Sequence, residues 1–201
     1  MTALAKTKRQ EGQALIAMGH CHLLGGEISS DSERKLVMGG IEMLSSQIFD
    51  QELAYVALGH LHLAQQVGAE HIRYSGSPLP MSFSEIHYPH QVLKIELSNQ
   101  SATEITSIKI PRSVALQRLP EKPAPIDEVL TLLEQQDWPS VCEEQQPYLQ
   151  VRVLLDKPEP SLRHKLEHAL QDKAVRLVKI ETSYPQQHQE HSQNILLEDV
   201  S

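Results

Sequence analysis

The sequence has little of what a membrane protein or a disulfide-bonded protein requires. No apolar run approaches the roughly 20 residues that cross a bilayer, and the first residues lack the order of a signal peptide. The 2 cysteines, Cys21 and Cys142, lie far apart and match neither a disulfide framework nor a CxxC zinc motif. We therefore expect a cytoplasmic protein with no membrane partner, in which both cysteines serve in packing.

Positive charge is also scarce. The chain has 18 Lys and Arg residues against 26 Asp and Glu residues, and its formal net charge is −8. A protein that holds DNA by a broad electrostatic surface is normally basic. A nuclease can instead hold DNA through metal ions and a few local basic residues, so the charge leaves a nucleic-acid partner open. Histidine is plentiful, with 11 in 201 residues, and this indicates metal chemistry.

Two apolar segments each end in glycine and histidine. Residues 14–18 precede Gly19 and His20, and residues 54–58 precede Gly59 and His60. Both have the character of buried strands that end in loops. Apolar residues at a helical spacing over 41–49 predict a helix between them, and hence a parallel crossover. The carboxyl ends of parallel strands share one edge of a sheet, where ligands bind.

His60 and His62 form a Gly-His-x-His motif, which presents two imidazoles from a tight turn. The alternative is that such histidines only pack or hydrogen-bond. Residues i and i+2 point opposite ways in a regular strand, so the turn bends or two ions are present. With His20 at the same edge, we expect the ring nitrogens of the three histidines within about 8 Å, because paired ions lie roughly 3.5 to 4 Å apart.

The other histidines are weaker candidates. His22 belongs to a rival GHCH pattern and could be a ligand or a loop residue, so it stays outside the expected ligand set. His164 and His168 have the i, i+4 spacing of zinc proteases, but the glutamate stands at Glu167 and no third ligand is near in sequence. We interpret them as a solvent-exposed helical face. The rest we expect to be solvated or packed.

The downstream half predicts a hairpin and a separate unit. Apolar residues alternate over 93–97 and 105–110 on either side of a turn. Prolines then concentrate from Pro111 to Pro125, which predicts a linker with a domain boundary near Pro111.

Beyond the linker, apolar stripes and alternating segments predict two amphipathic helices over one face of a small sheet. The helices fall near 126–133 and 162–170, and the strands near 149–155 and 175–180. We expect a core separate from that of residues 14–58, made of Leu130, Leu133, Val151, Val153, Leu166 and Leu170. The polar stretch from Gln186 predicts a mobile tail.

Two motifs together carry a family resemblance. The segments YVALGHLHLAQQV (Tyr55–Val67) and IRYSGSPLPMSFSE (Ile72–Glu85) closely resemble the SbcD nuclease subunits, a family within the calcineurin-like metallophosphoesterases. LIAMGH (Leu15–His20) and SDSER (Ser30–Arg34) resemble motifs that precede them in that family. The resemblance covers residues 14–110 well and the remainder more weakly.

The resemblance implies an α/β fold class in three parts. Residues 1–111 would be the carboxyl-terminal part of a metallophosphoesterase β-sandwich flanked by helices. Residues 112–183 would be a small α/β capping domain that binds DNA, and residues 184–201 a polar tail that begins a partner-binding segment.

The resemblance also implies a site with two divalent ions, usually Mn²⁺. By position, His20 and His60 would bind one ion and His62 the other. Ser75 and Ser77, in the SGSPLP stretch, are candidate substrate-binding residues.

The family implies a subunit of an ATP-dependent DNA exonuclease and endonuclease in repair, recombination and replication. Its partners would be DNA, an SbcC-type ATPase and a second copy. The family's D-x-H, G-D and G-N-H-D/E motifs precede the GH motif, and none occurs in the 18 residues before Gly19. We therefore expect no catalytic residue within this chain and an inactive fragment in isolation. NILLEDVS (Asn194–Ser201) resembles the start of the family's partner-binding tail, which we expect to be incomplete.

Two alternatives stay open. The chain could be a non-catalytic DNA-binding or partner-binding module of the same fold. It could also be a metallophosphoesterase for small phosphoesters, although that hypothesis leaves YSGSPLPMSFSE unexplained.

Overall fold

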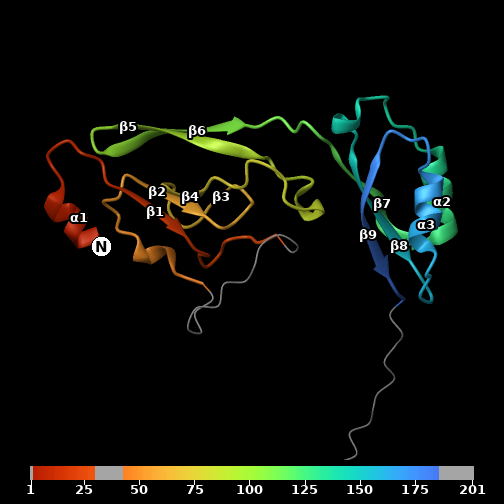
Figure 1. Ribbon diagram of the computed structural model, residues 1–201. Helices are drawn as coiled ribbons and strands as arrows, with labels where there is room; N and C mark the ends of the chain where they lie inside the picture. Colours follow the sequence, from red (N-terminus) through yellow and green to blue (C-terminus); the bar gives the residue numbers. More distant parts are fainter. Residues whose placement is uncertain (1, 30–42, 186–201) are drawn as a thin grey trace, which may run out of the picture. The chain divides into compact units, whose positions relative to one another are not determined.

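The computed structural model describes residues 2–29 and 43–185 (Figure 1). It has a mixed α/β fold, as the sequence predicts. The chain divides into two compact units, residues 1–117 and 118–201.

The first unit contains a four-stranded sheet in the order β1-β2-β4-β3. β1 pairs with β2 and β2 with β4 in parallel, while β3 pairs with β4 in antiparallel fashion. The parallel pairing predicted for the two histidine-bearing segments is therefore confirmed. The strands are β1 (Ile16–His20), β2 (Tyr55–Gly59), β3 (Gln65–Gln66) and β4 (Ile72–Tyr74).

The helix predicted over residues 41–49 is wrong in the part that the structure describes. Residues 43–49 contain only a 3-10 turn, η1 (Ser46–Ile48). Leu44 instead forms a parallel bridge with Leu23. Its N–H donates to the His22 carbonyl at 2.9 Å and its carbonyl accepts from the Leu24 N–H at 2.8 Å. These bonds use the backbone groups that a helix would need.

β1 is less buried than the sequence predicts. It alternates between exposed and half-buried residues, with Met18 86% exposed and Ile16 49% exposed, whereas β2 is largely buried. The reason is position, because β1 is an edge strand among the described residues. A helix that the sequence did not predict, α1 (Thr2–Lys8), lines a groove together with β1. The core of the first unit is formed by side chains of β2, β4 and the adjoining loops. It consists of Leu23, Leu53, Val56, Leu58, Leu61, Val67, Ile72 and Tyr74.

The predicted hairpin is confirmed. β5 (Gln91–Ser98) pairs with β6 (Ser101–Lys109) in antiparallel register. The two turn residues, Asn99 and Gln100, have φ of 48° and 72°. Two positive φ values in a two-residue loop match the twist of antiparallel strands. η2 (Phe83–Glu85), a 3-10 turn, precedes the hairpin.

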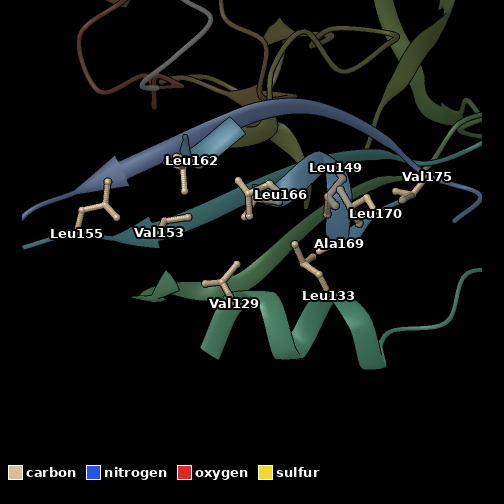
Figure 2. Packing of buried hydrophobic residues seen from close by; sticks show 11 residues of the cluster. Val129, Leu133, Leu149, Val153, Leu155, Leu162, Leu166, Ala169, Leu170 and Val175 are labelled. Atoms are coloured by element: carbon tan, nitrogen blue, oxygen red, sulfur yellow. The ribbon is translucent and has the colours of Figure 1, made fainter. Parts of the chain in front are cut away.

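The second unit is a three-stranded sheet in the order β7-β8-β9 with two helices on one face (Figures 1 and 2). Figure 2 shows Val129 and Leu133 of α2 packed with side chains of α3 and the strands. The predicted core residues all lie in this cluster, with Leu130 at its half-buried margin, and none belongs to the core of the first unit. The elements are β7 (Leu116–Pro125), α2 (Ile126–Gln135), η3 (Glu143–Gln145), β8 (Tyr148–Leu154), α3 (Leu162–Ala169) and β9 (Arg176–Ser183).

The proline-rich segment is not the linker that the sequence predicts. Most of it is β7, an edge strand of the second sheet. Proline is tolerated in an edge strand because the outward side needs no N–H donor. The division between the units falls between Gln117 and Arg118, slightly beyond the predicted boundary at Pro111. The predicted mobile tail and the SDSER motif lie outside the described residues. Within the residues that are described, no helix is long and apolar enough to cross a membrane.

Limited trypsin digestion tests where the units separate. Both arginines donate a side-chain hydrogen bond, Arg112 to the Ile86 carbonyl at 3.1 Å and Arg118 to Gln150 at 2.8 Å. They differ in backbone structure, because Arg112 lies in an irregular segment and Arg118 in β7. We expect cleavage after Arg112 before cleavage after Arg118, measured by intact mass over time. Arg112→Gln should remove the early product. Earlier cleavage after Arg118 would show that β7 is not a stable strand.

Candidate functional site

The parallel register brings two of the predicted histidines together. His20, the last residue of β1, is paired with Gly59, the last residue of β2, and His60 follows directly. The ring centroids of His20 and His60 are 5.3 Å apart, with the rings edge to face. Two imidazoles that bind one ion at about 2 Å each lie within about 4 Å at their nitrogens. This spacing of the rings fits such a pair.

Gly59 makes this approach possible. A Cβ on residue 59 would lie 2.9 Å from Nδ1 of His20. That is too close for an ordinary contact, so the His20 ring occupies the space that any larger residue would fill. Gly59, in the second Gly-His pair, thus leaves the space for the ring of His20, in the first pair.

His60 has an unusual backbone conformation. Its φ is 100°, in a region that residues with a Cβ rarely adopt. Such a conformation costs on the order of 1 to 3 kcal/mol and persists only where the surrounding structure fixes it. β2, which ends just before His60, supplies that support because Tyr55, Val56 and Leu58 are all buried.

His62 lies in the loop between β2 and β3 and contacts a residue that the sequence did not single out. Its Nδ1 is 2.8 Å from Oε1 of Glu85, a carboxylate with 0% exposure in η2. The only sequence signal for Glu85 was its place at the end of the YSGSPLPMSFSE motif.

His22 lies beside the first pair. Its ring centroid is 6.3 Å from that of His60, and its Nε2 is 3.4 Å from the Gly26 carbonyl. Within the described ranges, no group of three or more His, Cys, Asp and Glu side chains is arranged to hold a metal ion. His20 and His60 could supply two donors to an ion but not a complete coordination shell.

Tyr74 fixes the loop that follows His20. Its side chain is 1% exposed, and its hydroxyl donates to the Cys21 carbonyl at 2.7 Å and accepts from the Leu23 N–H at 3.0 Å. Cys21 itself packs against the core, and burial raises the pKa of its thiol. The sequence placed Tyr74 in a strand but gave no signal for this contact.

The SGSPLP stretch contacts the backbone of the loop that carries His62. Gly76 has φ of 84°, and a Cβ there would lie 2.9 Å from the His62 carbonyl oxygen and 2.8 Å from the Ala64 nitrogen. The Ser77 N–H donates to the same His62 carbonyl at 2.9 Å, and the Ser77 hydroxyl donates to the Leu79 carbonyl. Ser75 is half-buried beside them. Substrate binding by Ser75 and Ser77 stays a prediction.

The remaining histidines lie elsewhere. His164 and His168 are exposed on α3, which confirms the interpretation of HKLEH as a solvated face. His90 is buried, and its Nδ1 is 3.0 Å from the Ser77 carbonyl.

Comparison with known proteins extends over both units. A family model described as the type 5 capsule protein repressor C-terminal domain, the SbcD_C model, matches residues 112–201. The SbcD subunit of the SbcCD nuclease of Rhodobacter capsulatus is 35% identical over 173 residues, which are 86% of this chain and 42% of that protein. The SbcD subunit of Escherichia coli K12 is 27% identical over 182 residues, 90% of this chain and 44% of that protein.

Over most of its length the chain is therefore similar to SbcD subunits. It spans less than half the length of these two relatives. The SbcD subunit of Bacillus subtilis is 41% identical over 83 residues, 40% of this chain. The identities within the SbcD family therefore support the resemblance that the histidine motifs indicate.

The strain at His60 can be measured by comparing two substitutions. Both His60→Gly and His60→Ala remove the ring, but only alanine keeps the Cβ. We expect His60→Gly to be the more stable by about 1 kcal/mol in urea unfolding, because glycine adopts positive φ without cost. At the exposed His87, whose φ is not positive, the order should reverse. Equal stability of the two residue-60 variants would contradict a strained His60.

Tyr74→Phe tests the fixation of the His20 loop. It leaves the buried N–H of Leu23 and the half-buried carbonyl of Cys21 without the hydroxyl, which should destabilise the chain by roughly 1 to 3 kcal/mol in urea unfolding. Tyr55→Phe, in β2 and 4% exposed, is the matched control because its hydroxyl does not bond this loop. A loss no larger than that of Tyr55→Phe would show that the two hydroxyl bonds contribute nothing net.

Proposed function

We propose that the chain supplies histidine ligands to a two-ion phosphodiesterase site, as part of a DNA nuclease of the SbcCD type that acts in repair, recombination and replication. One observation carries this proposal. The ring pair of His20 and His60 lies at the carboxyl edge of parallel strands, in a chain similar to SbcD subunits.

The histidines would divide between two ions. His20 and His60 would hold one ion, and His62, in the loop beyond, would hold the other. The ions, Mn²⁺ in this proposal, would polarise the scissile phosphodiester and generate the nucleophilic water. In this proposal the histidines of the chain bind the ions, and neighbouring residues orient these histidines. Gly59 gives the His20 ring its space, Tyr74 holds the loop after it, and the SGSPLP stretch supports the His62 carbonyl.

Residues 1–201 alone do not complete such a site. Three neutral imidazoles cannot offset the repulsion between two divalent ions a few ångströms apart, which an anionic bridge normally does. Among the described residues no group of three or more His, Cys, Asp and Glu side chains is arranged to supply such a bridge. We therefore propose weak binding of at most one ion and no cleavage by these residues in isolation.

The second unit would act as a cap that directs DNA to the edge, in the cytoplasm. The relatives are named as subunits of SbcCD, so an SbcC-type ATPase and a second SbcD copy are the proposed partners. The separate core of the second unit also supports the second candidate function, a DNA-binding or partner-binding module without catalysis.

A nuclease assay tests the proposal and separates the two functions. The purified chain should not cut a linear duplex with Mn²⁺. Cleavage should appear when the part of the Rhodobacter capsulatus relative that lies outside the match is added as a second polypeptide, and His62→Ala should abolish it. His164→Ala, on the exposed face of α3, is the matched control and should retain it.

The other outcomes are also decisive. Cleavage by the chain alone that is lost in His62→Ala would refute the incomplete site. No cleavage in the mixture, despite complex formation, would favour the non-catalytic module.

A further inference from the structure

Glu85 is a buried carboxylate that the proposed metal chemistry does not use. Its side chain has 0% exposure at the end of η2. Burying a carboxylate is costly unless hydrogen bonds compensate for the lost water. The position of Glu85 therefore depends on its contacts.

Both carboxylate oxygens have a protein contact. Oε1 lies 2.8 Å from Nδ1 of His62, and Oε2 accepts a hydrogen bond from the Met81 N–H at 3.0 Å. The Met81 N–H is a fixed donor, so Oε2 must be an acceptor. A carboxylate has no hydrogen to donate, so the hydrogen bond of 2.8 Å to Oε1 requires the proton on Nδ1 of His62.

The turn that carries Glu85 is tied to the first unit at several points. The Ser84 hydroxyl is 2.5 Å from that of Ser29 and 2.6 Å from that of Ser82. The Tyr88 N–H donates to the Glu85 carbonyl at 2.9 Å, and Phe83 is buried. Glu85 thus reaches His62 from an anchored backbone.

We propose that Glu85 is a positioning residue that holds the His62 ring in the tautomer with the proton on Nδ1 and the lone pair on Nε2. A metal ion binds an imidazole only through a nitrogen without a proton. A carboxylate on the other ring nitrogen fixes that state and orients the ring. The inference rests on the proposed function in one respect, namely that His62 is a ligand through Nε2.

Glu85→Gln should reverse the tautomer. The amide has one acceptor oxygen, whereas the carboxylate accepts from both Met81 and His62. The Met81 N–H cannot change its role, so it takes the oxygen and the amide NH₂ faces His62. Nδ1 must then accept, and the proton moves to Nε2, the nitrogen that a metal would need.

The tautomer can be measured in the metal-free chain. Long-range ¹H–¹⁵N spectra of residues 1–201 with ¹⁵N-histidine at pH 8 distinguish protonated from unprotonated ring nitrogens, and His62→Gln assigns the signals. We expect an unprotonated Nε2 in the unaltered chain and an unprotonated Nδ1 in Glu85→Gln. In the unaltered chain, a proton on Nε2, or one on both nitrogens, would overturn the proposal even if Glu85→Gln failed to fold.

A matched variant controls for general loss of packing. Glu181→Gln removes a carboxylate that bonds Gln150 and Arg152 in the second unit, away from any histidine contact in the described network. It should leave the His62 tautomer unchanged. A change in this variant would mean that the ring responds to stability rather than to Glu85.

Metal binding gives the second measurement. The proposed function expects a complete site only with the complementary part of the Rhodobacter capsulatus relative, so this titration is made in that mixture. Broadening of the His62 ring signals by Mn²⁺ should there require roughly 10 to 100 times more metal in Glu85→Gln, the usual effect of losing such a partner. Equal Mn²⁺ dependence in both chains would contradict the positioning role. The expected tautomer without any Mn²⁺ broadening of His62 would leave the Glu85 contact standing and count against the proposed metal function, so the two failures are distinguishable.

Discussion

The candidate site depends on the parallel register between β1 and β2. This register places His20 opposite Gly59, so the His20 ring lies over a residue without a side chain and beside His60. A shift of one residue would turn His20 to the other face of the sheet. It would also place the ring opposite a residue with a side chain. Gly59 is therefore a structural requirement of the pair and not only a feature of a flexible turn.

A single stretch of sequence supports both histidine loops. Tyr74 bonds the loop after His20, Gly76 and Ser77 approach the backbone of His62, and Glu85 contacts the His62 ring. All of these lie in YSGSPLPMSFSE, one of the motifs that carry the resemblance to SbcD subunits. Its specificity has a physical basis, because a buried hydroxyl, a positive-φ glycine and a buried carboxylate each have few substitutes.

The sequence predicted features that follow from local pattern. Period-2 and period-3.6 apolar residues identified the hairpin and the helices of the second unit, and two short apolar runs that end in Gly-His identified β1 and β2. The prediction from sequence was wrong or silent where contacts between residues distant in the chain determine the structure. The apolar residues around Leu44 have the spacing of a helix, but the backbone of Leu44 forms hydrogen bonds with the backbone of His22 and Leu24. Pro120 and Pro123 indicated a linker but lie in an edge strand. Glu85 resembles any surface glutamate until the fold buries it against His62.

His20 and His60, whose ring centroids lie 5.3 Å apart, are held by strands that differ in burial and pairing. His60 follows β2, which is buried and paired on both sides, and burial of an aliphatic side chain such as Val56 or Leu58 contributes roughly 1.5 to 3 kcal/mol. The burial of both side chains together, roughly 3 to 6 kcal/mol, is larger than the strain of about 1 to 3 kcal/mol at the His60 backbone, so the unusual φ is maintained. His20 ends β1, which among the described strands has one ladder and exposes Ile16 and Met18. The position of His20 therefore depends on one set of strand bonds, the space at Gly59 and the Tyr74 hydroxyl.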